Sequence, residues 1–152
     1  MTQPSLFETG GGTSAMAHVD GGARGNPGPA GYGVRIERED GTVVELKASV
    51  GIATNNVAEY RGLIAALEWA ASAGVTRLEI RSDSLLLVKQ MLGEYRVKNA
   101  GLQPLWEQAR RLVQRIGDVR FEHVRRELNK DADRLANEAM DQAAAPRSPG
   151  AV

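Results

Sequence analysis

AMAHVDGGARGNPGPAGYGVRIEREDGTVVELKASV, residues 15–50, is the stretch that decides the predicted fold. Residues 32–39 and 42–50 alternate apolar and polar side chains on either side of Asp40-Gly41, a dipeptide that strongly indicates a hairpin turn. Residues 15–20 predict a short strand, and the glycine- and proline-rich stretch 21–31 predicts a loop after it. The sequence therefore predicts three antiparallel strands, with Asp20 at the end of the first.

The rest of the chain alternates between helical and strand patterns. Apolar side chains spaced by three and four predict an amphipathic helix over 56–73 that stops at Gly74. The later elements are expected as a strand over 77–82, a helix capped by Ser82 or Asp83 and ending at Leu92, a helix over 102–116, a strand over 119–124, and a helix over about 130–143 capped by Asn129. This order predicts an α/β fold with a five-stranded mixed sheet, in which three antiparallel strands are followed by two joined through helical crossovers, and helices cover both faces.

The composition is that of an ordinary soluble protein. The 152 residues include 42% hydrophobic and 25% charged side chains and no cysteine. Disulfides and thiolate metal sites are therefore excluded, and no apolar run approaches the roughly 20 residues that span a bilayer. No secretory signal is readable at the start, so a cytoplasmic monomer without a membrane partner is expected. Residues 15–142 are expected to form one domain between disordered tails at 1–14 and 143–152.

The net charge argues against a strongly basic nucleic-acid binder. Nineteen basic and nineteen acidic side chains give a formal charge of zero. The distribution is uneven, however, because residues 96–134 hold ten Lys or Arg and six Asp or Glu. A local basic face is therefore compatible with the sequence.

Four carboxylates are candidates for one shared metal site. Asp20 and Asp83 each close a predicted strand, and strand ends are where ligands gather in open α/β sheets. Glu59 and Asp133 lie on the apolar sides of their helices, so both are expected to face the sheet. Four ionised carboxylates at one place need cations, and all-oxygen ligands favour Mg²⁺ or Mn²⁺. Two such ions roughly 4 Å apart would support phosphodiester hydrolysis. Taken singly, each acid also has an ordinary explanation as a turn, cap or surface residue.

Four stretches around these acids resemble motifs of the type 1 ribonucleases H. They are DGGARGNPGPAGYG at 20–33, TNNVAE at 54–59, SDS at 82–84 and NKDADRLA at 129–136. The resemblance covers about residues 15–140. It implies a Mg²⁺-dependent endonuclease that hydrolyses the RNA strand of RNA–DNA hybrids and leaves 5′-phosphate and 3′-hydroxyl ends.

The resemblance also implies contacts with the substrate. The residues expected along the minor groove, where 2′-hydroxyls and base edges are accessible, are Gly21, Gly22, Asn26, Asn55 and Asn56. Thr54 and Ser84 are expected to hold a phosphate of the DNA strand, and Asn129, which begins the last motif, is a further substrate-binding candidate.

The chain departs from the family pattern in three places. Many members carry a histidine in the loop that is 125–129 here, but His123 lies inside a predicted strand, where a structural role is favoured. The pattern HVRRELN resembles a subgroup that uses an arginine instead, so Arg126 is the candidate for stabilising phosphate charge or assisting product release. A basic protruding helix is replaced by the short segment 94–101, and Leu85 stands where some relatives have a base-sensing glutamine.

Two other functions and a structural role stay open from the sequence. Cleavage of double-stranded RNA is an alternative, because its A-form geometry is similar to that of the hybrid. A hybrid-binding module that does not cut is another, although loss of an acid would indicate it and none is lost. A purely structural domain is disfavoured, because it would have no reason to aim four carboxylates at one point.

Overall fold

The structure, a computed structural model, describes residues 13–144. In this range the chain forms β1 (Thr13–Ala23), β2 (Gly28–Arg38), β3 (Val43–Ala53), α1 (Asn55–Ser72), β4 (Val75–Ser82), α2 (Leu85–Met91), α3 (Gln103–Ile116), β5 (Asp118–His123), the 3₁₀ helix η1 (Arg126–Leu128) and α4 (Lys130–Ala144). The sheet order is β3-β2-β1-β4-β5. The pairs β1–β2 and β2–β3 are antiparallel, whereas β1–β4 and β4–β5 are parallel. The predicted five-stranded mixed sheet is confirmed.

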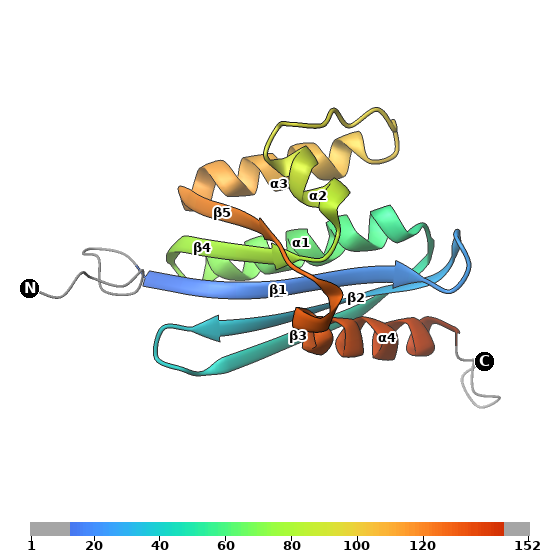
Figure 1. The fold of residues 1–152 in the computed structure, drawn as a ribbon, viewed down its shortest axis with the longest axis horizontal. Helices are drawn as coiled ribbons and strands as arrows, with labels where there is room; N and C mark the ends of the chain where they lie inside the picture. The colour runs from blue at the N-terminus through green and yellow to red at the C-terminus, as the bar shows by residue number, and fades with distance from the viewer. Residues whose placement is uncertain (1–12, 145–152) are drawn as a thin grey trace, which may run out of the picture.

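Helices cover both faces of this sheet (Figure 1). α1 packs on β1 and β2 from one side with α3 against it, and α4 packs on β1, β2 and β3 from the other side. α1 begins where the Thr54 hydroxyl accepts a hydrogen bond from the Val57 amide at 3.2 Å, and the chain turns out of it at Gly74, whose φ is +75°. Its apolar side, including Leu63 and Leu67, lies in the core under the sheet.

The stretch 21–31, predicted as a loop, is mostly strand. β1 runs on to Ala23 and β2 starts at Gly28, so only residues 24–27 lie between the two strands. The prediction was wrong because glycine serves here for close packing as well as for turning. A Cβ at Gly31 would lie 2.6 Å from the Ala139 Cβ, and one at Gly33 would lie 2.5 Å from the Leu135 Cβ. The glycines therefore let α4 lie directly on β2.

Other boundaries differ by small amounts. Thr13 and Ser14, assigned to the N-terminal tail, belong to β1, and the predicted C-terminal tail begins inside α4. The rest of both predicted tails, 1–12 and 145–152, lies outside the described residues. The cap of α2 is Ser84, which accepts the Leu87 amide at 3.2 Å, and not Ser82 or Asp83. No helix within residues 13–144 has the length and apolar character needed to cross a membrane.

Candidate active site

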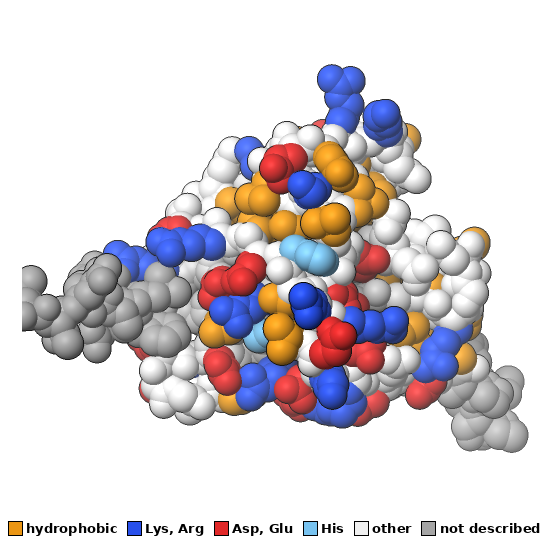
Figure 2. All heavy atoms as spheres, viewed as in Figure 1, with side chains coloured by type: hydrophobic (Ala, Val, Ile, Leu, Met, Phe, Trp, Pro, Cys, Tyr) orange, Lys and Arg blue, Asp and Glu red, His pale blue; other side chains and the backbone are white. Residues whose placement is uncertain are grey.

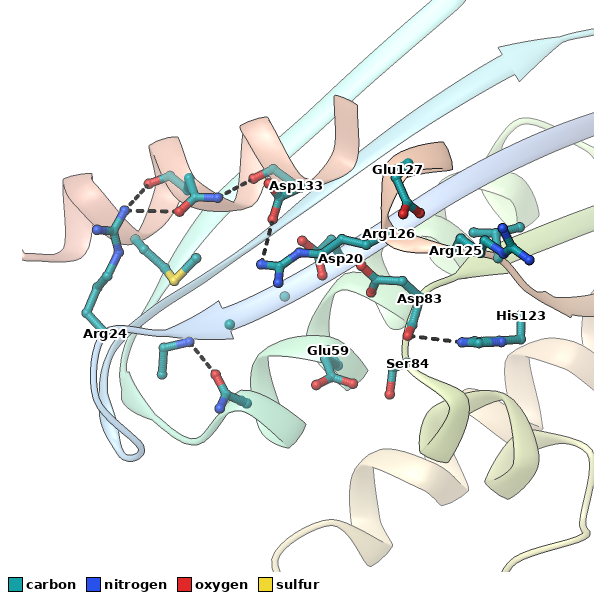
Figure 3. Close-up of a pocket in the computed structure, with 17 residues that line it drawn as sticks. Asp20, Arg24, Glu59, Asp83, Ser84, His123, Arg125, Arg126, Glu127 and Asp133 are labelled. Atoms are coloured by element: carbon teal, nitrogen blue, oxygen red, sulfur yellow. Dashed lines mark hydrogen bonds and ion pairs between the residues drawn. The ribbon is translucent and has the colours of Figure 1, made fainter. Parts of the chain in front are cut away.

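A cavity of about 820 Å³ opens beside the carboxyl end of β4, between α4 and the start of α1. Figure 3 shows that its walls come from segments far apart in the sequence: β1, the β1–β2 turn, α1, the start of α2, the end of β5, η1 and α4. Its lining residues are Asp20, Gly21, Gly22, Ala23, Arg24, Asn55, Glu59, Asp83, Ser84, His123, Val124, Arg125, Arg126, Glu127, Asp133, Asn137 and Met140. All four predicted acids and Arg126 are in this set.

The parallel pairing of β1 and β4 brings the first two acids together. Val19 of β1 is in register with Ser82 of β4, so the next residues, Asp20 and Asp83, follow from neighbouring strands. Asp20 lies inside β1, paired with Gly33 of β2, and does not end the strand as the sequence predicted. Asp83 does leave β4 at its carboxyl end, as predicted.

The other two acids reach the cavity from the first turns of helices on opposite faces of the sheet. Glu59 is the fifth residue of α1, and Asp133 the fourth of α4. Figure 3 shows Asp133 and Glu59 on either side of Asp20, with Asp83 beside them. The expectation that both helical acids face the sheet is therefore met by their positions.

Burial and mutual repulsion make Asp20, Glu59 and Asp83 hard to ionise without a cation. The pKa of Asp20 is raised to about 8, first by burial and then by the nearby Asp83 and Asp133. Burial also raises the pKa of Glu59, against a hydrogen bond from Ser84 that lowers it. The pKa of Asp83 is raised by burial, while the Arg126 charge lowers it. A divalent cation would favour the ionised form of these three acids.

The donor set fits such a cation. Four carboxylates without cysteine offer only oxygen ligands, as hard cations prefer. Within residues 13–144, no three acidic or histidine side chains form a ready-made metal cluster. Mg²⁺ usually binds one or two carboxylates and completes its shell with water and substrate phosphate oxygens, so a preassembled cage is not required.

Arg126 and His123 stand on the η1 side of the cavity. Arg126 Nη2 lies 3.9 Å from Asp133 Oδ1, and its side chain is 81% exposed. His123 is the last residue of β5, and its Nε2 lies 3.2 Å from the backbone oxygen of Asp83. The histidine therefore supports the Asp83 main chain, whereas the arginine faces the acids.

The residues expected along the minor groove form a connected edge, but only part of it lines the cavity. Gly21, Gly22 and Asn55 do, and so does Ser84, which was expected to hold a phosphate. The Asn55 side-chain oxygen accepts a hydrogen bond from the Ala23 backbone amide at 2.8 Å, and the Asn55 backbone amide donates to Asn26 Oδ1 at 3.1 Å.

Four predicted substrate-binding residues, Asn26, Thr54, Asn56 and Asn129, do not line the cavity. Thr54 is occupied as the cap of α1, and Asn56 lies beside it in the first turn without lining the cavity. Asn129 is the clearest departure, because its side chain is only 1% exposed. Its Nδ2 donates to the Val19 oxygen at 2.9 Å, so it joins α4 to β1 and neither caps the helix nor faces the cavity. A buried amide with a backbone partner is a structural group.

The segment after α2 carries no helix before α3 begins at Gln103. Figure 2 shows hydrophobic side chains gathered over α2 on the same face of the molecule as the acids. The exposed large ones here are Leu85, Leu86, Leu92 and Tyr95. Leu85 thus presents an apolar surface to solvent at the start of α2.

Sequence reasoning missed several cavity residues, among them Arg24, Asn137 and Met140. Asn137 and Asp141 follow Asp133 at intervals of four, so a helical projection could have placed them on the same side of α4. Arg24 carried no such signal, because its partners are more than 110 residues away in the chain.

Comparison with known sequences identifies similar proteins. A family model described as "Reverse transcriptase-like" matches residues 18–139. The ribonuclease HI of Halobacterium salinarum is 45% identical over 128 residues, which are 84% of this chain and 64% of that protein. A ribonuclease H of Phenylobacterium zucineum is 33% identical, with 89% of this chain and 95% of that protein covered. A bifunctional protein of Mycobacterium tuberculosis is 50% identical over 85% of this chain but only 36% of its own length. The chain thus spans about a third of that longer relative.

Solved structures of RNase H proteins are similar to this chain in both sequence and fold. The N-terminal RNase H domain of a Mycobacterium tuberculosis protein, fused to maltose-binding protein, has a TM-score of 0.84 and 48% identity over 87% of this chain and 96% of that one. LC11-RNase H1 in complex with an RNA/DNA hybrid has a TM-score of 0.80 and 43% identity over 86% of this chain and 99% of that one.

Proposed function

The chain belongs to the ribonuclease H family, and we propose on that premise that it is an endonuclease that hydrolyses the RNA strand of RNA–DNA hybrids with two Mg²⁺ ions. Mn²⁺ would substitute for Mg²⁺, because both accept oxygen ligands. The products would be 5′-phosphate and 3′-hydroxyl ends. Because the chain spans only part of some relatives, the proposal concerns the domain formed by the described residues.

One observation carries the proposal: four carboxylates from four different elements line a single cavity. Asp20 and Asp83 come from adjacent parallel strands, and Glu59 and Asp133 from helices on opposite faces. An arrangement that raises the pKa of three of these acids costs stability, so a structural role does not account for it. Binding of cations and phosphate does.

When bound, the cations supply activation of the attacking water and charge stabilisation in an in-line displacement. The carboxylates of Asp20, Glu59, Asp83 and Asp133 would hold the cations. Water attacks phosphorus, the bond to the 3′ oxygen breaks, and that oxygen leaves with a proton. A Cβ at Gly21 would collide with the Ala58 backbone, so this glycine lets the start of α1, which carries Glu59, lie directly on β1.

Arg126 is proposed to take the place of the loop histidine found in other members. Its guanidinium is permanently charged, so it cannot carry a proton at neutral pH. It lies within ion-pair distance of Asp133 and is otherwise open to solvent. From there it can stabilise charge on the phosphate or on the departing product.

The groove contacts are proposed with one change from the sequence expectation. Gly21, Gly22 and Asn55 line the cavity and are positioned to contact the minor groove, and Ser84 to contact a phosphate. Asn26, Asn56 and Thr54 border this surface. Asn129 is not proposed as a contact, because it is buried.

The deciding experiment incubates the protein with labelled RNA–DNA hybrid, double-stranded RNA and double-stranded DNA in Mg²⁺, Mn²⁺ or EDTA. Metal-dependent cutting of the RNA strand of the hybrid, with 5′-phosphate products, is expected. Cutting of double-stranded RNA alone would replace the substrate assignment, and binding of hybrid without cutting would leave a binding module. No cutting of any substrate would remove the enzyme assignment. The monomeric state and cytoplasmic location stay predictions.

A further inference from the structure

We propose that Arg24 forms a second anion subsite of the cavity, which binds a backbone phosphate of the substrate a few nucleotides from the one at the four acids. The inference rests on the proposed function, because it assigns part of the same nucleic-acid surface. Arg24 lies inside the stretch 20–33 that resembles a family motif, but it is not among the residues that the resemblance implied as substrate contacts.

Arg24 stands on the wall of the cavity opposite Arg126. Figure 3 shows Arg24 rising from the β1–β2 turn on one side and Arg125 and Arg126 starting from the η1 side, with the side chain of Arg126 reaching over Asp20 toward Asp133. Along β1, Arg24 is four residues beyond Asp20, at most roughly 13 Å at the rise of a strand. Phosphates of one strand follow each other at roughly 3.4 Å along a duplex axis. A duplex held at the acids therefore presents other phosphates within reach of Arg24.

The guanidinium of Arg24 is held in place by α4. Its Nη2 donates to Asp141 Oδ1 at 2.7 Å and to Asn137 Oδ1 at 3.2 Å. Asn137 in turn donates from Nδ2 to the backbone oxygen of Asp133 at 2.9 Å. The arginine is thus oriented by the same helix that carries one of the four acids.

The backbone of Arg24 is also fixed. Its amide donates to the Pro29 oxygen at 2.8 Å across the turn. The turn closes so tightly that any Cβ at Gly28 would collide with the Arg24 backbone oxygen. A side chain on such a turn loses little further freedom when it binds an anion, which favours affinity.

Two nitrogens of the guanidinium are left for a ligand. Within residues 13–144, the hydrogen bonds of this side chain all come from Nη2. Nε and Nη1 therefore keep their N–H donors, and each can donate a charge-assisted hydrogen bond to a phosphate oxygen. The ion pair with Asp141 does not satisfy the charge, because side chains 46% and 68% exposed gain little from pairing in water.

The charge of the cavity requires such a residue. Its lining contains five acids, Asp20, Glu59, Asp83, Glu127 and Asp133, against three arginines. A polyanion would be repelled from the acids except where cations or arginines neutralise it. Arg24 provides the positive charge on the β1–β2 side of the cavity, and Arg125 and Arg126 provide it on the η1 side.

The test measures binding of a fluorescent RNA–DNA hybrid by anisotropy at increasing KCl, in Mg²⁺, with Asp83→Asn as the common background to prevent turnover. Loss of one phosphate contact makes the slope of log affinity against log salt shallower by roughly 0.7 to 0.9. We expect Arg24→Ala to show this change and to bind about tenfold more weakly at low salt. Arg24→Lys should keep the slope with weaker binding, because lysine keeps the charge but not the planar guanidinium that α4 orients.

Arg134→Ala is the matched control. Arg134 is 47% exposed, pairs with Glu45 and Glu138, and does not line the cavity. It should leave affinity and slope unchanged. Asp141→Asn distinguishes phosphate binding by Arg24 from a purely structural link between Arg24 and α4. This variant should keep the slope of log affinity against log salt, because the charge of Arg24 remains.

The outcomes separate the two proposals. The subsite is wrong if Arg24→Ala has the same salt dependence of binding as the Asp83→Asn parent. It is also wrong if Asp141→Asn lowers the affinity and the slope as much as Arg24→Ala does, because Arg24 would then only connect the β1–β2 turn to α4. Unchanged thermal unfolding of Arg24→Ala would exclude misfolding as the cause of weaker binding. If the chain with Asp83 intact binds hybrid but cuts nothing, the enzyme proposal fails while the subsite is still decided by the slopes. No binding of hybrid by any variant would overturn the subsite.

Discussion

The two arginine-bearing walls of the cavity differ in how they are held. On the β1–β2 side, Arg24 is tied to α4 by hydrogen bonds as short as 2.7 Å. On the η1 side, Arg126 is 81% exposed and has a single ion pair at 3.9 Å within the described residues. A fixed guanidinium suits binding that is the same in ground and transition states, whereas one that is free to move can follow charge as it develops. The difference predicts that the first wall acts on substrate affinity and the second on the rate of cleavage.

The largest effect is expected from the acids between the two walls. Asp83→Asn removes a charge that holds cations without changing the size of the side chain. Turnover of RNA–DNA hybrid in Mg²⁺ should fall by at least about a hundredfold, while binding largely survives because both walls remain. Single-turnover cleavage and anisotropy check this. Unchanged turnover would remove Asp83 from the site. The catalytic centre between the two walls would then have to consist of other residues.

Replacement of Arg126 tests the comparison directly. Arg126→Ala should lower kcat about ten- to a hundredfold and change KM less, the reverse of the pattern expected from Arg24→Ala. Arg126→Lys should recover part of kcat, because the charge is restored. Steady-state kinetics on the same hybrid measures both parameters. A rate equal to wild type would leave Arg126 as a solvent-exposed residue without a function, and the walls would not differ as proposed.

Both walls depend on how closely α4 lies on β2, since α4 carries the partners of both arginines. Gly33→Ala places a Cβ about 2.5 Å from the Leu135 Cβ, so the helix must shift. Overpacking of this kind lowers the free energy of unfolding by about 1–3 kcal/mol. Chemical denaturation measures it, and hybrid affinity and kcat should fall together. Gly101→Ala is the control: it is exposed and meets only the end of the Asn99 side chain, so less than about 0.5 kcal/mol is expected.

A smaller effect is expected from pH on the cation-free protein. The pKa of Asp20 rises from 3.8 to about 8 on folding, so between these values the folded state binds more protons than the unfolded state. Stability in EDTA should therefore fall as pH rises toward 8. His18, whose pKa is lowered from 6.5 by burial, acts in the opposite direction only below pH 6.5. The clean window is thus pH 6.5 to 8.

Thermal unfolding between these pH values, with and without Mg²⁺, measures this effect. The melting temperature in EDTA should drop by a few degrees, about what a change of 1 kcal/mol produces in a domain of this size. Mg²⁺ should stabilise more at the higher pH, because the acids must ionise to bind it. Asp20→Asn should flatten the pH dependence. A melting temperature that does not change with pH in EDTA would mean that the acids are not as close as the structure places them.

Much of the fold and the four acids could be predicted because their signals are local. Alternation around Asp40-Gly41 and the three-four spacing of α1 depend on neighbours in the chain, and both are confirmed. The glycines were misread for the same reason. Locally, glycine between strands indicates a turn, but Gly31 and Gly33 are glycine because a helix some hundred residues later packs against them. Asn129 was misread likewise, since its partner is the Val19 backbone, 110 residues away.

The sequence by itself determined which residue types this protein has for its chemistry: four carboxylates in the order and spacing of a known family, no cysteine, and an arginine in a loop where other members have histidine. Only the tertiary structure decided how these residues meet. The β1–β4 register places Asp20 beside Asp83. Arg24 forms a hydrogen bond with Asp141, which is 117 positions away in the chain. The physical reason is that periodicity and turn preferences act over a few residues, whereas a site is assembled by packing of elements that are distant in sequence.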